Sequence, residues 1–172
     1  MPHFKMPDGE QLYVRIIGRG EPVLVLSGLG MQSWQWLPYL AMNLNKFQFI
    51  IPDWRGFGGS KNCAIPQDLN AIENHCRDVK TLIEQLKLDQ FILMGYSMGA
   101  TTSMHGFHYG DLASKIKAYL HIDQTPKISC DESWRYGLMG DKHPQFKQLL
   151  ASLDDFLSQR VSIQYIDELS TQ

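Results

Sequence analysis

The sequence predicts an α/β fold, with a mostly parallel β-sheet and helices on its faces, and three observations carry this prediction. Apolar runs of strand length, such as Pro22–Leu26 and Phe47–Ile51, alternate with helix-like segments. Pro22–Leu26 is apolar throughout, which is typical of a parallel strand buried on both faces. A third run, Phe91–Met94, leads directly into a serine between two glycines and then into a helix-like segment. This alternation favours parallel strands joined by right-handed crossovers.

The N-terminal part of the chain reads as two strands followed by an irregular helix. Gln11–Ile17 alternates between polar and apolar residues, as a half-buried strand does, and a turn separates it from Pro22–Leu26. Ser33 is a residue type favoured at helix N-caps, so we expect a helix to begin there. Its apolar positions are Trp34, Leu37, Leu40 and Leu44. Pro38 predicts that the start of this helix is irregular.

A long amphipathic helix is predicted over residues 68–86, with Asp68 as its N-cap. Its apolar residues recur at spacings of three and four, the pattern of a helix that lies on a sheet. They are Leu69, Ile72, Cys76, Val79, Ile83 and Leu86. Ile116–Ile122 predicts one more strand, which ends at Asp123. After it the pattern changes to two helical stretches, residues 144–157 and 161–169, without an apolar strand run.

Composition is that of an ordinary globular protein. The chain has 172 residues, 44% of them hydrophobic, and a net charge of −2, which offers no electrostatic footprint for nucleic acid or an anionic membrane. Cys63, Cys76 and Cys130 are odd in number and lack metal-ligand spacing, so we expect no metal and a reduced, cytoplasmic location. Because residues 1–10 lack an apolar signal segment and no apolar run approaches membrane-spanning length, we expect neither a leader nor a membrane partner.

The sequence Gly95-Tyr96-Ser97-Met98-Gly99 places a serine at a sharp turn between a buried strand and a helix. Such a turn strains the backbone of its central residue, and a Cβ at either flanking glycine would collide with a neighbouring element. The pattern alone is only moderately specific, and an ordinary turn serine is the alternative. With its strand and helix, the segment resembles the nucleophile elbow of the α/β-hydrolase superfamily. The resemblance implies that Ser97 is a nucleophile.

Two further loops carry the resemblance. Ser27-Gly28-Leu29-Gly30 is similar to the superfamily's His-Gly-x-Gly, with serine in place of histidine, and implies an oxyanion hole made by the backbone amides of Leu29 and Met98. Turn glycines are the alternative explanation for this loop. The stretch Asp53–Ser60 resembles the Asp-x-Arg-Gly-x-Gly-x-Ser of the superfamily. We expect its polar residues to hold the loop by hydrogen bonds rather than to perform chemistry.

The resemblance does not supply the base that serine needs. In the superfamily the order is serine, acid and then a histidine after the last of about eight strands. The resemblance covers residues 11–130, extending at most to 172, and the last two strands have no counterpart. We therefore expect a partial α/β-hydrolase core over residues 1–130, the beginning of a helical cap over residues 131–172, and no catalytic histidine.

None of the six histidines is an obvious substitute for the missing base. Four of them, His3, His75, His105 and His108, are expected to be solvated or to take part in packing. His121 lies within the last predicted strand. Asp123 stands where some members of the superfamily carry their acid, and Ser97, Asp123 and His143 occur in the catalytic order. His143 would have to fold back from the cap, and a strand-terminal turn explains Asp123 equally well.

The function implied by the resemblance is that of a cofactor-independent serine hydrolase for a small ester or related acyl substrate. Trp34 and Tyr96, with Trp36 and Met98, are expected near the mouth of the substrate pocket, although the tryptophans fit a packing role equally well. Haloperoxidase-like enzymes, C–C bond hydrolases and lactonases of the superfamily are not distinguished. The alternative function is a non-catalytic scaffold that binds a small molecule or a partner protein. An open apolar edge at Ile116–Ile122 predicts a homodimer, aggregation or a longer product.

Overall fold

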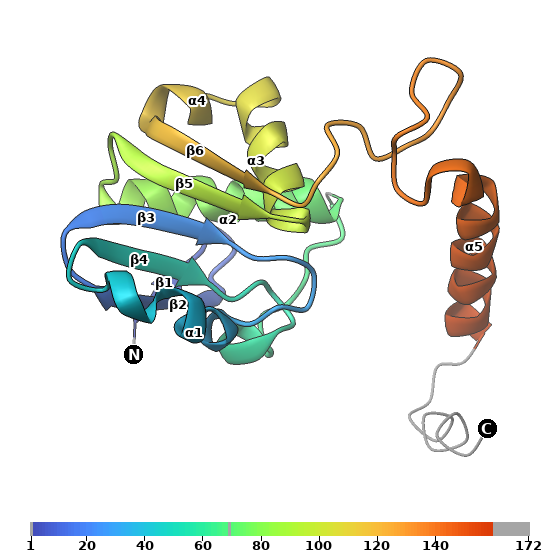
Figure 1. Ribbon diagram of the computed structural model, residues 1–172. Coiled ribbons are helices and arrows are strands. Elements are labelled where there is room, and N and C mark those ends of the chain that lie inside the picture. The colour runs from blue at the N-terminus through green and yellow to red at the C-terminus, as the bar shows by residue number, and fades with distance from the viewer. Residues whose placement is uncertain (1, 69, 160–172) are drawn as a thin grey trace. The chain divides into compact units, whose positions relative to one another are not determined.

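The structure is a computed structural model that describes residues 2–68 and 70–159. It divides into two units, the first ending at Gln124 and the second beginning at Thr125 (Figure 1). The sequence suggested a boundary slightly later, at residue 130.

The first unit is built on a six-stranded sheet. Its strands are β1 (His3–Lys5), β2 (Gln11–Gly18), β3 (Glu21–Leu26), β4 (Phe47–Pro52), β5 (Phe91–Tyr96) and β6 (Ile116–Ile122), in the spatial order β1-β2-β4-β3-β5-β6. Strand β3 pairs in parallel with β4 and β5, and β6 is parallel to β5. Strand β2 is antiparallel to both β1 and β4. The prediction of a mostly parallel sheet is confirmed.

The connectivity creates a crevice at one end of this sheet. Strand β4 follows β3 on one side, whereas β5 lies on the other side of β3, so the strand order reverses there. In open α/β sheets, ligands bind in the crevice outside the carboxyl ends of the strands at such a reversal. The loops that follow β3 and β5 therefore face the position where a site is expected.

The long helix α2 (Ala71–Leu86) begins later than the sequence suggested. Its N-cap is Asn70 and not Asp68, because the Glu73 amide donates to Asn70 Oδ1 at 3.0 Å and the Asn70 amide donates to the Glu73 carboxylate at 3.2 Å. Asp68 instead forms an ion pair with Arg77 at 3.4 Å. Helices α3 (Met98–Tyr109) and α4 (Leu112–Lys115) follow β5.

The helix expected from Ser33 is broken into three short pieces, η1 (Ser33–Trp36), α1 (Leu37–Leu40) and η2 (Ala41–Asn43). Its N-cap is Gln32 rather than Ser33, and the Gln32 amide donates to Gln35 Oε1 at 2.7 Å. The Ser33 amide is used elsewhere, as a donor to Asp53 Oδ1 at 2.5 Å. A long-range contact thus determines how this helix begins.

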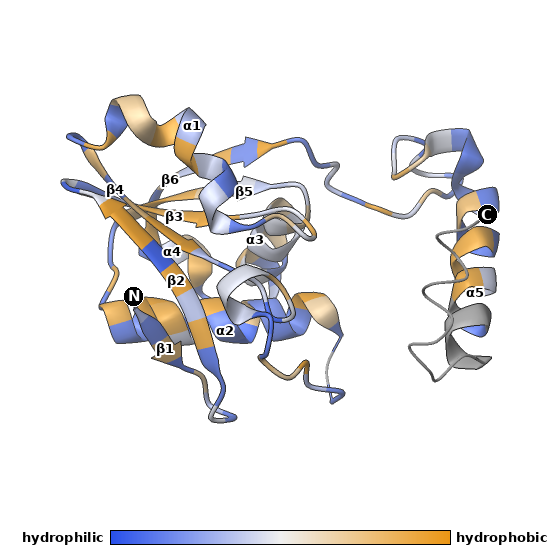
Figure 2. Cartoon of the chain, turned by 90° about the horizontal axis from the view of Figure 1, so that it is seen from below, coloured by the Kyte–Doolittle hydropathy of each residue, from blue (hydrophilic) through white to orange (hydrophobic). Residues whose placement is uncertain are grey.

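Apolar side chains pack against both faces of the sheet. Leu24 and Leu26 of β3 belong to one buried cluster together with Val79 and Leu82 of α2. Val23 and Val25, the alternate residues of β3, belong to a second cluster, which includes Trp36, Leu40 and Phe49. Figure 2 shows the hydrophobic colouring along β3. The continuous apolarity of Pro22–Leu26 therefore reflects burial on both faces, as predicted.

The second unit contains an isolated bridge between Asp131 and Trp134, the turn η4 (Gly140–Lys142) and helix α5 (His143–Gln159). Helix α5 confirms the helix expected over residues 144–157. The helix expected over residues 161–169 lies outside the described residues. No helix in the described ranges is both long and apolar enough to span a membrane.

Candidate active site

Ser97 occupies the sharp turn between β5 and α3. It is the N-cap of α3, with φ 50° and ψ −117°. Such a conformation costs a residue other than glycine about 1–3 kcal/mol, so surrounding contacts must hold it in place. The Ser97 amide donates to the Ile122 carbonyl of β6 at 3.0 Å, and the Ser97 carbonyl accepts from the amides of Ala100 at 2.9 Å and Thr101 at 3.1 Å. Both neighbouring elements thus fix the strained turn.

The two flanking glycines are required by close packing. A Cβ on Gly95 would lie 2.8 Å from Ala100 Cα, and a Cβ on Gly99 would lie 2.0 Å from the Leu26 carbonyl oxygen. No ordinary Cβ contact is that short. The collisions predicted from the sequence are therefore present, with the helix at Gly95 and with strand β3 at Gly99.

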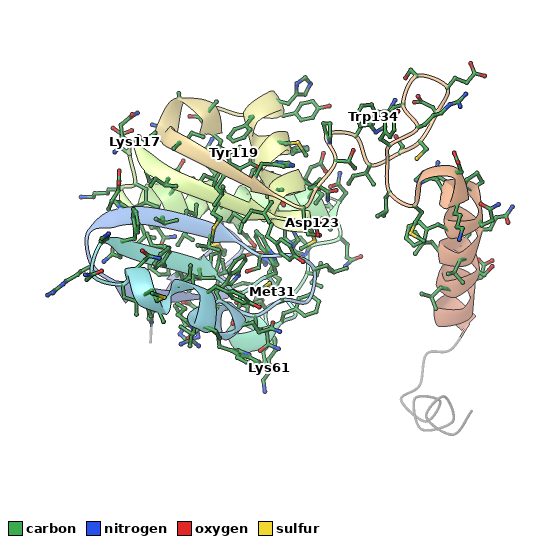
Figure 3. The ribbon with its side chains drawn as sticks, viewed as in Figure 1. Met31, Lys61, Lys117, Tyr119, Asp123 and Trp134 are labelled. Atoms are coloured by element: carbon green, nitrogen blue, oxygen red, sulfur yellow. The ribbon has the colours of Figure 1, made fainter. Side chains whose placement is uncertain are left out.

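The loop after β3 passes directly against the serine. A Cβ on Gly28 would lie 3.1 Å from the Tyr96 ring and 3.4 Å from Ser97 Cβ, and Gly30 has a positive φ of 71°. An open pocket of about 370 Å³ lies here. Its lining residues are Gly28, Leu29, Gly30, Met31, Gln35, Tyr96 and Ser97. Figure 3 shows Met31 in this loop. Sequence reasoning did not single out Met31 or Gln35, whose residue types carry no catalytic signal.

The residues predicted near the mouth of the pocket lie in different surroundings. Tyr96 lines the pocket, and its ring packs edge-on against Trp36 at a centroid distance of 6.0 Å. Trp34 is not among the lining residues. Its side chain is 55% exposed, and its indole N–H donates to Gln32 Oε1 at 3.1 Å. Trp36 is buried in the core.

A second cavity, of about 110 Å³, lies between α2, α3 and α4. It is more enclosed and more apolar, but it includes neither Ser97 nor the loop after β3. Its lining residues include Cys76, whose pKa is raised to about 11 by burial. Because a neutral thiol is a poor nucleophile, we place the candidate site at the pocket beside Ser97.

The backbone around Ser97 supplies amides without acceptors. Met98 is the first residue of α3, and the amides of a helix's first turn have no partner within the helix. The Leu29 amide forms no hydrogen bond within residues 2–68 and 70–159. The positive end of the α3 dipole adds to the attraction for a developing negative charge. Within the described residues, the Leu29 and Met98 amides are therefore left to donate a hydrogen bond to a bound group.

Each histidine in the described ranges has its own surroundings. Three of them make ring contacts: His3 packs against Tyr13, His75 stacks on Trp54 and His108 packs on Tyr109. His105 Nδ1 lies 3.4 Å from Cys76 Sγ, and His143 Nδ1 contacts the Leu138 carbonyl at 2.8 Å. His121 contacts the Tyr119 hydroxyl at 3.0 Å and the Gln124 carbonyl at 2.7 Å. In the described residues of the first unit, no hydrogen bond or ring contact joins His3, His75, His105, His108 or His121 to Ser97.

Asp123 follows β6 directly, with φ 51°, and its side chain is exposed (Figure 3). The residue before it, Ile122, accepts the hydrogen bond from the Ser97 amide. Asp123 is thus one residue beyond a direct backbone contact with the strained turn.

The loop Asp53–Ser60 is held by hydrogen bonds, as predicted. Asp53 accepts from the amides of Ser33 at 2.5 Å and Gly59 at 2.8 Å, and Ser60 Oγ accepts from the Tyr13 amide at 2.9 Å. These contacts join the loop after β4 to the segment after β3 and to β2. The loop therefore supports the wall of the pocket.

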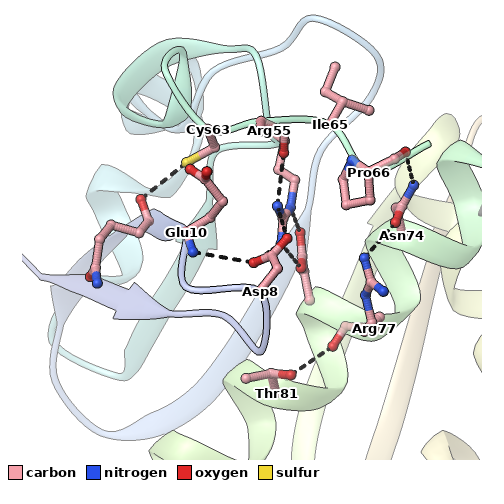
Figure 4. A network of polar contacts seen from close by, with 12 residues as sticks. Asp8, Glu10, Arg55, Cys63, Ile65, Pro66, Asn74, Arg77 and Thr81 are labelled. Carbon is pink, nitrogen blue, oxygen red and sulfur yellow. Dashed lines mark hydrogen bonds and ion pairs between the residues drawn. The ribbon is translucent and has the colours of Figure 1, made fainter. Parts of the chain in front are cut away.

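Arg55 is the centre of a buried ion network (Figure 4). Its guanidinium contacts Asp78 at 2.6 and 2.8 Å and Asp8 at 2.6 and 3.1 Å. These carboxylates raise the pKa of Arg55, and the hydrogen bond from Arg55 lowers the pKa of Asp8. Burial, with the nearby charge of Arg55, lowers the pKa of His75 to about 4. Arg55 is thus charged and His75 is neutral at neutral pH.

Known proteins with the same fold match most of this chain. A model of the alpha/beta hydrolase fold family matches residues 21–162. An AB hydrolase superfamily protein, YisY of Bacillus subtilis, is 29% identical over 80% of this chain and 51% of its own. A pimeloyl-[acyl-carrier protein] methyl ester esterase of Legionella pneumophila is 28% identical over 68% of this chain and 44% of its own.

A solved structure, the esterase EaEST from Exiguobacterium antarcticum, has a TM-score of 0.68 and 25% identity over 81% of this chain and 52% of its own. The chain spans about half the length of these proteins or less. With the strand order, the strained serine and the family match in agreement, the chain belongs to the α/β-hydrolase fold family.

Proposed function

We propose that this protein is a serine hydrolase that acts on a small ester or related acyl substrate, with Ser97 as its nucleophile. The observation that carries the proposal is the conformation of Ser97, a non-glycine residue at φ 50° at the start of a helix and in the wall of a pocket. A strained backbone of this kind persists where function uses it. Two of the similar proteins are described as esterases, which favours ester substrates.

In the proposed reaction, Ser97 Oγ attacks the acyl carbon of the ester while a base takes its proton. The amides of Leu29 and Met98 donate hydrogen bonds to the oxyanion that forms. The C–O bond to the alcohol then breaks, the alcohol leaves with the proton, and water hydrolyses the acyl-enzyme. Tyr96 borders the acyl group in the pocket. The exposed ring of Trp34 is proposed to border the entrance of the pocket.

The acid of the catalytic machinery is assigned to Asp123. Its position, one residue beyond the Ile122–Ser97 hydrogen bond, supports this role, because the acid must orient a base that reaches Ser97. No base is assigned in the described part of the first unit, since none of its histidines contacts Ser97. We also propose that residues 1–130 form the hydrolase core segment and that residues 131–172 begin a helical cap.

Labelling with a fluorophosphonate probe tests the proposal. The full chain should form an adduct on the tryptic peptide that contains Ser97, as located by mass spectrometry, and Ser97→Ala should abolish it. Ser114→Ala is the matched control, because this serine is exposed and its hydroxyl donates to the Asp111 carbonyl of the same turn. A folded sample that forms no adduct at Ser97 would contradict the proposed serine-hydrolase function.

The second candidate function is a non-catalytic scaffold that binds a small molecule or a partner protein. It is favoured by one observation, namely that no histidine in the described part of the first unit contacts Ser97. A scaffold would bind a small acyl compound at the pocket, shifting the NMR resonances of Tyr96 and Met31, without acquiring a covalent adduct. Formation of the adduct would exclude this candidate.

A further inference from the structure

Ser27, the first residue of the loop after β3, is held at both of its oxygen atoms by tryptophans. Its carbonyl accepts a hydrogen bond from the indole N–H of Trp54 at 2.9 Å. Its hydroxyl accepts one from the indole N–H of Trp36, also at 2.9 Å. All three residues are buried, and Ser27 and Trp54 are completely inaccessible. The two indoles come from separate segments, one after β4 and one from η1.

These contacts constrain the loop because the peptide bond is planar. The Ser27 carbonyl and the Gly28 amide lie in one rigid plane, so the hydrogen bond from Trp54 fixes the orientation of that plane. The next plane contains the Gly28 carbonyl and the Leu29 amide. It is held by the Met31 amide, which donates to the Gly28 carbonyl at 3.2 Å. Both planes that lead to the Leu29 amide are thus fixed by hydrogen bonds.

The loop has little else to hold it at this point. Gly28 lacks a side chain, and glycine has more accessible backbone conformations than any other residue. The Leu29 side chain is 74% exposed, so its packing does not anchor the residue. Without the hydrogen bond from Trp54, the first of the two planes would be free to turn about the Gly28 dihedrals.

Trp54 is itself held on its ring face. The His75 ring from α2 stacks on the indole at a centroid distance of 4.2 Å and an interplanar angle of 22°. His75 is only 9% exposed, and its Nδ1 has no hydrogen-bond partner in the described residues. Packing, rather than hydrogen bonding through that nitrogen, is therefore what this ring contributes to the contact.

We infer that Trp54 is a positioning residue. Its indole N–H orients the Ser27–Gly28 peptide and so the Leu29 amide beside Ser97, and the His75 ring supports the indole. The catalytic consequence rests on the proposed function, in which the Leu29 amide is an oxyanion donor. The orientation of the loop does not depend on that function, and it is measurable separately.

Backbone dynamics test the orientation without any need for activity. Trp54→Phe keeps an aromatic ring for His75 to stack on and removes the indole N–H together with one of the two fused rings. ¹⁵N relaxation should give the Leu29 amide an order parameter of about 0.85 in the parent chain and below about 0.6 in this variant, with the Met98 amide unchanged. Trp134→Phe is the matched control, because the Trp134 indole also donates to a backbone carbonyl, that of Lys127, at 3.0 Å. A folded Trp54→Phe protein with an unchanged order parameter at Leu29 would overturn the inference.

Labelling of Ser97 tests the catalytic consequence. Loss of one oxyanion donor costs on the order of 10²–10³ in rate, so a mobile donor should slow the maximal rate of fluorophosphonate labelling at least about tenfold. The concentration of probe at half-maximal rate should not change, because the pocket walls remain. His75→Phe should retain the rate and His75→Ala should lower it. Labelling of Trp54→Phe at a rate within about twofold of the parent rate would overturn the positioning role. If the parent chain is not labelled at all, the proposed function is refuted, and the relaxation measurement alone decides the inference about Trp54.

Discussion

Arg55→Met should strongly destabilise the first unit, because it leaves Asp78 as an unpaired buried charge. The Arg55 and Asp78 side chains are only 2% and 1% exposed, and Nε and Nη2 of Arg55 meet the two carboxylate oxygens of Asp78 at 2.6 and 2.8 Å. Asp78 has no other hydrogen-bond partner in the described ranges. Breaking a buried pair on one side typically costs about 3–5 kcal/mol. That is a large fraction of the roughly 5–15 kcal/mol by which whole domains are stable.

Two further variants serve as controls, because the electrostatic explanation predicts how each changes the free energy of unfolding. In Arg55→Met/Asp78→Leu both charges are gone, so most of the lost stability should return, since an apolar pair of similar volume can replace a buried ion pair. Asp8→Asn removes the second partner of Arg55, but the Asp8 side chain is 32% exposed. Water screens that pair, and its loss should cost less than about 1 kcal/mol.

Urea unfolding followed by circular dichroism measures all three free energies of unfolding. At this chain length, Arg55→Met should also lower Tm by roughly 6–20 °C. If the double variant is as unstable as Arg55→Met, the cost does not come from the unpaired carboxylate of Asp78, and the electrostatic explanation is wrong.

Three further predictions concern other parts of the protein. Because the pKa of His75 in the folded protein is lowered to about 4, the unfolded chain takes up a proton between about pH 6.5 and 4 that the folded chain does not, and the free energy of unfolding should fall by up to about 3 kcal/mol over this range. In urea unfolding, His75→Phe should make the free energy of unfolding nearly independent of pH over that range. An unchanged dependence on pH would contradict the assignment to His75. Gly99→Ala should destabilise by about 1–3 kcal/mol in the same assay, because its Cβ would meet the Leu26 carbonyl at 2.0 Å; unaltered stability would count against that contact. Since burial raises the Cys76 pKa to about 11, iodoacetamide at pH 8 should alkylate Cys130 before Cys76 in peptide mass spectrometry, and the reverse order would refute burial of that thiol.

The strands of the sheet could be predicted because their signals are local. Pro22–Leu26 is apolar throughout, and β3 forms there, extended by one residue. Strand β1 was missed, because the three residues His3–Lys5 are too few to show a period. Strand β5 runs two residues further than its apolar run, since Gly95 and Tyr96 pair with β6 in a ladder that local composition does not reveal.

Helix starts were predicted less well where two residues compete for the cap. Asp68 and Asn70 are both good capping types, but only Asn70 is followed three residues later by a glutamate that completes a capping box. That signal was present in the sequence. At Ser33 the sequence does not reveal that Asp53 of another loop accepts from its amide, although the contact between Gln32 and Gln35 at this helix start is local.

The arrangement around Ser97 was predictable in outline, since the glycine pattern encodes the turn. That Tyr96 lines the pocket follows from its place beside the serine, but the exposed position of Trp34 depends on the broken helix that follows β3. The contact between Trp54 and Ser27 had no sequence signal. It exists because β3 and β4 are neighbours whose carboxyl ends meet at one edge of the sheet.

The position of β3 in the sheet also sets an order for folding. Strand β3 lies between β4 and β5, so its second edge is paired only when Phe91–Tyr96 has joined the sheet. During synthesis β3 leaves the ribosome long before β5 does, and pairings between distant parts of a chain form slowly. Until then this apolar strand has an open edge, which is the feature that promotes aggregation. The strand that leads into the loop beside Ser97 thus has its second edge paired only after a long further stretch of chain has been made.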